Sequence, residues 1–198
     1  MALGRNIYEN LVEAVKPVVA KYGISGVTTR NLAKAANVSD SNIYRFFPSR
    51  NDLLFEAYRR TSGEMTDQLI AEIDELKSRH GEIKLIDCAR RVYMKAWRYL
   101  VDDPDMCLFH SFYFNSIEFC GKAVEFHDAQ TKQLTEHMSW LFNSEEDATR
   151  CLYNIFSMLY SSARLAVLGV LPNTEETAEK CFRDAYHVLL CQSNFWPD

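Results

Sequence analysis

The chain has 198 residues, of which 47% are hydrophobic and 13% aromatic, and its formal net charge is −5. This hydrophobic content is sufficient for a packed core of one large domain or two smaller ones. No apolar run approaches the roughly 18 residues that a membrane span needs, and the N-terminus lacks a signal-peptide pattern, so we expect a cytoplasmic protein without membrane contact.

The net charge is divided unevenly along the chain. Residues 1–60 hold nine Lys/Arg against five Asp/Glu, which gives +4, whereas the remaining 138 residues hold 13 against 22, which gives −9. An asymmetry of this kind indicates a head that faces DNA on a body that does not.

The first predicted element is a helix over residues 3–22. Ile7, Leu11, Val15 and Val18 recur on one helical face, and Gly23 is a natural C-terminal stop. Pro17 lies near the end of this helix, where we expect it to cause a kink or a local break.

A short helix, a tight turn and a second short helix are predicted between residues 28 and 47. Thr28 is a suitable N-cap for the first helix, and Asn37 tolerates the left-handed backbone that the turn requires. The small apolar face of this helix consists of Leu32, Ala33, Ala35 and Ala36.

The second short helix is predicted over residues 40–46, with Ser39 as its N-cap. Ile43 and Phe47 lie four residues apart and are expected to hold it on the core. Its outward side chains are then Ser41, Asn42, Tyr44 and Arg45. After Pro48, Ser49 is the expected N-cap of a third helix. The pattern is that of a helix-turn-helix whose second helix enters a DNA major groove.

Two linked runs carry a family resemblance. They are Thr28-x-x-x-Leu32-Ala33-x-x-Ala36-x-Val38-Ser39 and Ile43-Tyr44-x-x-Phe47-Pro48-Ser49-Arg50-x-x-Leu53. Together they resemble the TetR family of bacterial transcriptional regulators. The resemblance implies an all-α fold, with a DNA-binding domain at residues 1–48 and an effector-binding and dimerisation domain at residues 49–198.

The resemblance also implies which residues contact DNA. They are Thr28, Thr29, Arg30, Ser39, Asp40, Ser41, Asn42, Tyr44, Arg45 and Arg50. Arg50 and the Tyr44 hydroxyl suit phosphate, whereas Ser41, Asn42 and Arg45 are candidates for base edges. The alternative is that these are ordinary solvated polar residues. Asp40 departs from the family pattern, because a carboxylate near the DNA backbone lowers affinity unless it pairs with a cytosine amino group or with Arg45.

The rest of the chain is predicted to be helical. A long helix is expected from Arg50 to Lys77, followed by helices around residues 86–100, 122–142, 145–169 and 174–193, with a capping sequence at 143–146. The helix over 122–142 is expected to turn Val124, His127, Leu134, Met138 and Leu141 inward.

An aromatic stretch and its neighbours are candidates for an apolar effector pocket. These residues are Tyr93, Trp97, Phe109, His110, Phe112, Tyr113, Phe126 and Trp140. Pockets between helices are common ligand sites, although an aromatic stripe at helical spacing also suits core packing alone.

The last two helices are the expected dimer interface by resemblance. The candidate residues are Leu152, Ile155, Phe156, Leu159, Ala163, Val167, Ala178, Phe182, Ala185 and Leu189. Symmetric doubling lets a short recognition helix read two half-sites of a palindromic operator. The alternative is packing within one chain.

No catalytic or metal-binding pattern is found, so we expect neither an enzyme nor a cofactor. The six cysteines show no zinc-site spacing and are interpreted as buried thiols. The expected function is that of a DNA-binding transcriptional regulator, a repressor released by a small molecule. The alternatives are an activator of the same family and a helical ligand- or partner-binding protein that no longer reads DNA.

Overall fold

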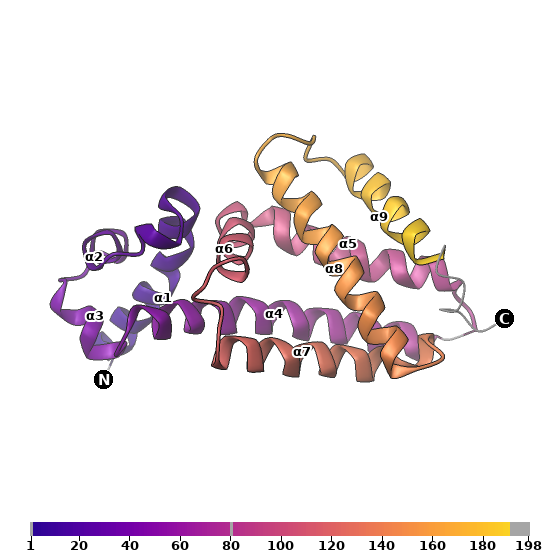
Figure 1. Ribbon diagram of the computed structural model, residues 1–198, viewed down its shortest axis with the longest axis horizontal. Helices are drawn as coiled ribbons and strands as arrows, with labels where there is room; N and C mark the ends of the chain where they lie inside the picture. The colour runs from indigo at the N-terminus through magenta and orange to yellow at the C-terminus, as the bar shows by residue number, and fades with distance from the viewer. Residues whose placement is uncertain (1, 80, 191–198) are drawn as a thin grey trace. The chain divides into compact units, whose positions relative to one another are not determined.

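Helices make up all the regular secondary structure of this computed structural model, which describes residues 2–79 and 81–190 except for the side chains of residues 2–5, 85 and 188–190 (Figure 1). No strand occurs in these ranges, and the all-α prediction is confirmed. Among the described helices, none has the length and apolarity to cross a membrane.

The α-helices follow the predicted order. They are α1 (Ala2–Tyr22), α2 (Thr29–Ala36), α3 (Ser41–Phe46), α4 (Arg50–Ser78), α5 (Leu85–Asp102), α6 (Pro104–Phe114), α7 (Lys122–Met138), α8 (Glu145–Val167) and α9 (Glu175–Leu190). Single 3₁₀ turns occur at η1 (Ile24–Gly26) and η2 (Ser139–Leu141). The predicted end of the last helix, near residue 193, lies outside the described residues.

The chain packs as two compact units, which are described separately. The first unit combines Met1–Ser62 with Asp103–Phe126, and the second combines Gly63–Asp102 with His127–Asp198. Helix α4 begins in the first unit and ends in the second. The first unit therefore contains the helix-turn-helix together with α6 and the connection that follows it.

The core of the first unit joins α1 to α4 and α6. Leu11 and Val15 of α1, Leu53 of α4, and Phe109 and Tyr113 of α6 are at most 1% exposed and belong to one apolar cluster. Removing this apolar area from water is the main force that holds α6 on the head.

A polar contact reinforces the packing of α6 on α1. The Asp103 carboxylate caps α6 by accepting a 3.0 Å hydrogen bond from the Met106 backbone N–H, and it also accepts one from Lys16 of α1 at 3.2 Å. One side chain thus starts α6 and ties it to the head.

Local signals account for the helix-turn-helix. The Thr28 hydroxyl accepts a hydrogen bond from the Asn31 backbone N–H at 3.2 Å, and Asn37 adopts φ 53° and ψ 48°, so both predictions are confirmed. Two details were wrong. Ala35 is exposed, and no side chain caps the backbone at the start of α3.

Helix α1 runs as one element through Pro17, contrary to the expected local break. Proline lacks the N–H that would donate to the carbonyl of Glu13, four residues earlier. Because Pro17 is exposed, that carbonyl lies on the solvent side of the helix, where water can supply the missing donor.

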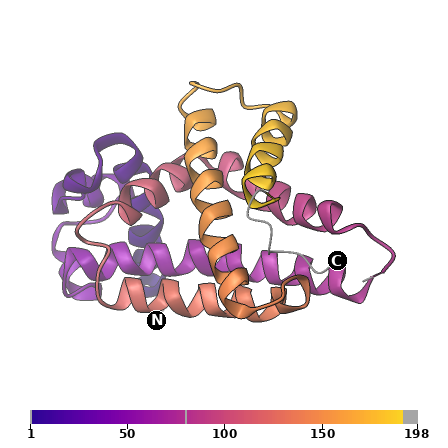
Figure 2. The same cartoon turned by 45° about the vertical axis from the view of Figure 1, so that its right-hand side comes forward.

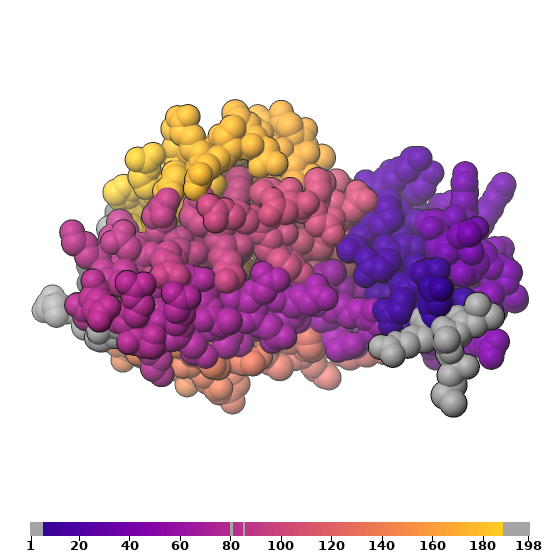
Figure 3. Space-filling model, turned by 180° about the vertical axis from the view of Figure 1, so that it is seen from behind, coloured from indigo at the N-terminus to yellow at the C-terminus, as the bar shows by residue number. Residues whose placement is uncertain are grey.

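The second unit contains α5, α8, α9 and the later parts of α4 and α7. Helices α8 and α9 form an antiparallel pair (Figure 2), and in the space-filling view α9, in yellow, lies beside α5, in pink (Figure 3). As predicted, Ser144 caps α8 by accepting a 3.1 Å hydrogen bond from the Asp147 backbone N–H. Val124, expected to point inward from α7, is instead 37% exposed and lies in the first unit.

Candidate nucleic-acid interface

Helix α3 has one buried and one exposed side. Ile43 and Phe47 are 5% and 4% exposed and belong to the core of the first unit. On the other side, Ser41 and Arg45 are exposed and Tyr44 is 64% exposed. This six-residue helix is therefore held by two apolar anchors and presents its polar side chains outward, as its sequence predicts.

A side-chain contact joins this exposed side to the start of α2. The hydroxyl oxygens of Thr29 and Tyr44 lie 3.2 Å apart. Thr28 and Arg30 flank Thr29 and are exposed. The structure thus brings together the candidates from α2 and α3.

A small hydrogen-bond network occupies the turn before α3. The Ser39 Oγ lies 3.1 Å from the Ser41 Oγ and accepts a 2.8 Å hydrogen bond from the Asn42 Nδ2. The Ser39 hydroxyl therefore accepts a hydrogen bond from a side chain, whereas the predicted N-cap would accept one from a backbone N–H of α3. Asn42 is half-buried and already engaged, so a bidentate contact to adenine requires its amide to reorient.

Asp40 and Arg45 do not pair with one another. Among the described residues no ion pair involves the exposed Asp40 carboxylate, and the Arg45 guanidinium lies over the Phe46 ring, 5.7 Å from its centroid. Asp40 thus keeps an uncompensated negative charge on the candidate surface, whereas Arg45 is positioned by a cation–π contact that leaves its donors available.

Arg50 is involved in a contact that sequence reasoning missed. Its Nη2 lies 2.5 Å from the Glu118 Oε1, and the neighbouring Asp52 pairs with Lys122. The partners are 68 and 70 residues apart in sequence, so no local pattern indicates either contact. The predicted cap is confirmed, because Ser49 Oγ accepts a 3.1 Å hydrogen bond from the Asp52 backbone N–H.

Stacked and charged side chains anchor α4, and Phe47 just before it, to α1. The Tyr8 and Phe47 rings stack with centroids 4.9 Å apart, and the Arg60 guanidinium covers Tyr8 and pairs with both Glu9 and Glu56. The Glu56 carboxylate accepts hydrogen bonds from Arg59 and Arg60, which lower its pKa to about 2, and the bond from Arg59 is the larger cause. These contacts fix the position of α4, and with it Arg50.

The predicted pocket residues are divided between the two units. Phe109, His110, Phe112, Tyr113 and Phe126 belong to the first unit, whereas Tyr93, Trp97 and Trp140 belong to the second. In the first unit, Tyr58 contacts the rings of His110, Tyr113 and Phe126 at centroid distances of 5.4, 5.5 and 6.2 Å, so these members pack as core. Phe112 is 36% exposed.

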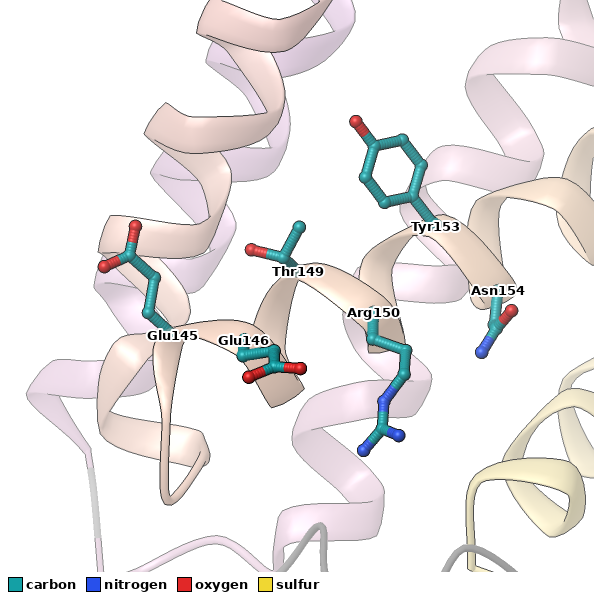
Figure 4. A pocket seen from close by; sticks show the side chains of 6 residues that line it. All are labelled: Glu145, Glu146, Thr149, Arg150, Tyr153 and Asn154. Carbon is teal, nitrogen blue, oxygen red and sulfur yellow. The ribbon is translucent and has the colours of Figure 1, made fainter.

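A pocket of about 580 Å³ lies against α8 and contains none of the predicted pocket residues. Figure 4 shows its lining side chains, all from the first part of α8: Glu145, Glu146, Thr149, Arg150, Tyr153 and Asn154. Because one helix supplies the whole lining, the pocket is a feature of the exposed face of α8.

Most of the predicted dimer residues are used within the protomer. Leu152, Leu159, Ala163, Ala178, Phe182 and Ala185 are at most 4% exposed, whereas Ile155, Phe156 and Val167 are half-buried. The side chain of Leu189 lies outside the described residues. Helical periodicity identified apolar faces correctly here, but it does not distinguish a face that packs on α5 from one that meets a second chain.

The cysteine interpretation holds only in part. Cys88, Cys107 and Cys151 are buried, Cys181 is half-buried, and Cys120 is exposed. Cys191 lies outside the described residues. Within the described ranges no cluster of three or more His, Cys, Asp or Glu side chains is arranged to hold a metal ion.

Comparison with known proteins adds to this geometry. Residues 11–57 match the bacterial regulatory proteins of the tetR family. A segment of 79 residues is 24% identical to the fatty acid metabolism regulator protein of Bacillus subtilis, and it spans 40% of this chain and 41% of that protein.

Two solved structures share the fold over most of both chains. A TetR family transcription regulator from Marinobacter aquaeolei has a TM-score of 0.73 at 18% identity, covering 92% of this chain and 95% of its own. The fatty acid degradation regulator FadR from Bacillus halodurans has a TM-score of 0.71 at 18% identity, covering 92% and 94%. The helix-turn-helix is thus the part of the chain that is similar in sequence to the tetR family of bacterial regulatory proteins, and the chain as a whole shares the fold of solved TetR-family transcription regulators.

Proposed function

We propose that the protein is a sequence-specific repressor that binds a palindromic DNA operator as a homodimer and is released by a small-molecule effector. The observation that carries the proposal is the two-sided α3, with Ile43 and Phe47 in the core and Ser41, Tyr44 and Arg45 turned outward. Such a helix presents donors and acceptors to base edges while its anchors fix its orientation.

The exposed side chains divide by chemistry into two groups. Arg45 suits the two acceptors of guanine in the major groove, and Ser41 and Asn42 suit neighbouring base edges. Thr28, Thr29, Arg30, Tyr44 and Arg50 surround them and suit phosphate oxygens. Ser39 and Asp40 lie at the start of α3, where Asp40 accepts a hydrogen bond from a cytosine amino group or else lowers affinity.

For the homodimer we propose the outer face of α8 as the contact surface. Tyr153 is 44% exposed, Phe156 is half-buried, and Leu168 and Val170 beyond the helix end are 52% and 66% exposed. These apolar side chains replace the buried members of the predicted interface. Substituting Phe156 by Glu should shift the chain to monomer in light scattering, with Glu146→Gln, on the same helix, as a control that leaves the dimer intact.

For the effector we propose an acyl compound. Support comes from the two relatives whose names refer to fatty acid metabolism and degradation. The effector would bind in the body and shift α4, which the two units share, so that the two heads of a dimer no longer fit successive major grooves. The effector can shift the equilibrium between the arrangement of the heads that fits DNA and the one that does not only by as much as its affinities for the two differ.

The proposal is tested by binding purified protein to DNA selected from a random pool. Arg45→Ala should weaken binding to the selected sequence by about five- to 150-fold, because a bidentate arginine–guanine contact contributes about 1–3 kcal/mol. Arg79→Ala removes the same charge from an exposed site in the second unit and should leave binding unchanged. If the wild type, Arg45→Ala and Arg79→Ala bind the selected sequence with equal affinity, α3 is not the recognition helix. Adding long-chain acyl thioesters, with acetyl thioester as control, tests the effector class.

A further inference from the structure

The ion pair between Arg50 and Glu118 involves a residue to which we assign phosphate contact. Arg50 is the first residue of α4, and its side chain is 42% exposed, whereas Glu118 lies in the connection between α6 and α7 and its side chain is 13% exposed. We propose that Glu118 competes with the DNA phosphate for Arg50 and thereby sets the affinity of the helix-turn-helix for DNA. This inference rests on the proposed DNA-binding function.

Competition follows from the chemistry of the guanidinium group. Carboxylates and phosphates use the same planar fork of N–H donors, so Arg50 must leave Glu118 to form a full bidentate contact with phosphate. Among the described residues Arg50 is the only cation paired with Glu118, and the carboxylate is mostly covered by protein. When Arg50 turns to a phosphate, the Glu118 carboxylate loses its partner, and the free-energy cost of that loss opposes DNA binding.

A second ion pair keeps Glu118 within reach of Arg50. Lys122, the first residue of α7, pairs with Asp52 in the first turn of α4, and this contact is the main cause of the lowered pKa of Asp52. Between the two pairs the chain turns at Gly121, whose φ of 51° favours glycine. The connection is thus held against the start of α4 at two points.

The arrangement makes DNA affinity depend on a segment outside the helix-turn-helix. Glu118 follows α6, which packs in the core of the first unit. A displacement of the α6–α7 connection that separates Glu118 from Arg50 frees the guanidinium for phosphate without any change in α3. Glu118 is accordingly an affinity-determining residue that acts through Arg50.

The test is a double-mutant cycle on the full chain, with binding to the selected DNA measured by fluorescence anisotropy. Glu118→Gln keeps the shape of the side chain and removes its charge, and it should tighten binding by about two- to fivefold, the range that corresponds to a partly exposed ion pair at the protein surface. In an Arg50→Gln background the same substitution should have no effect. Glu125→Gln is the matched control, because Glu125 is exposed in the same unit and forms no ion pair among the described residues.

Each outcome decides between the hypotheses. Tightening that requires Arg50 supports the competition. Unchanged or weaker binding by Glu118→Gln, or tightening that persists without Arg50 or is matched by Glu125→Gln, overturns it while leaving the DNA-binding function in place. If no variant, wild type included, binds any selected DNA while thermal unfolding shows folded protein, the proposed function fails and this inference fails with it.

Discussion

The hydroxyl groups of Thr29 and Tyr44 lie 3.2 Å apart and join the N-terminus of α2 to the exposed side of α3. Both residues are candidates for phosphate contact, so the hydrogen bond fixes the position of one candidate group relative to the other in the absence of DNA. Groups fixed in this way lose less conformational entropy on binding.

Removing the Tyr44 hydroxyl tests this arrangement. Tyr44→Phe keeps the ring but loses the contact with Thr29 and the donor for phosphate, so we expect DNA binding to weaken by about tenfold, as for the loss of a hydrogen bond to a charged group. Anisotropy titration measures the change. Tyr22→Phe, which makes the same change at an exposed tyrosine near the end of α1 outside the candidate contacts, is the control and should bind as the wild type does.

The uncompensated Asp40 carboxylate gives a second prediction. Asp40→Asn removes a negative charge beside the DNA backbone, and we expect about fivefold tighter binding at low salt, with the gain shrinking as salt screens the interaction. Asp128→Asn, which makes the same change in the second unit, should have little effect. Weaker binding with lost preference at one cytosine would instead assign base recognition to Asp40.

The left-handed backbone at Asn37 predicts different effects of two small substitutions on stability. Asn37→Ala keeps the β-carbon at φ 53° but loses the short polar side chain that makes this conformation tolerable, so it should lower the free energy of unfolding by about 1 kcal/mol, whereas Asn37→Gly should be close to neutral. Ala35→Gly, at an exposed helical position nearby, should be destabilising by about 0.5–1 kcal/mol. Urea denaturation of the three variants measures these values, and a stable Asn37→Ala variant would contradict the turn geometry.

The lowered pKa of Glu56 predicts a pH dependence of stability. Because the folded pKa of about 2 lies below the ordinary value of 4.5, the stabilisation is complete above pH 5 and is lost as the pH falls from there towards 2. Glu56→Gln should lower the free energy of unfolding by about 1–2 kcal/mol at pH 7, and the difference should vanish near pH 2. Denaturant titrations at several pH values measure it. A difference independent of pH would rule out the ion pairs as its cause.

The helix-turn-helix was predictable because its determinants are local. The Thr28 cap, the left-handed Asn37 and the Ile43–Phe47 spacing each act within a few residues, and sequence alone is sufficient to place them. The continuous α1 was missed because Pro17 is exposed, a fact that depends on how the whole helix packs.

The parts that could not be predicted depend on distant contacts. Nothing near Arg50 indicates Glu118, and nothing in the aromatic stretch indicates that Phe109 and Tyr113 complete the core of the head. The same limit applies to α8, where Leu152 and Leu159 show the periodicity of an interface but are buried within one chain.

The most direct test of the account is selection of DNA from a random pool by the purified full chain, followed by binding measurements over a range of salt concentrations. We predict enrichment of a palindrome with half-site centres about one helical turn or slightly more apart, and a log–log salt slope of about −0.9 for each phosphate contacted. Failure of folded protein to enrich any sequence at low salt, with or without acyl effectors, would contradict the central claim that this protein is a sequence-specific DNA-binding regulator.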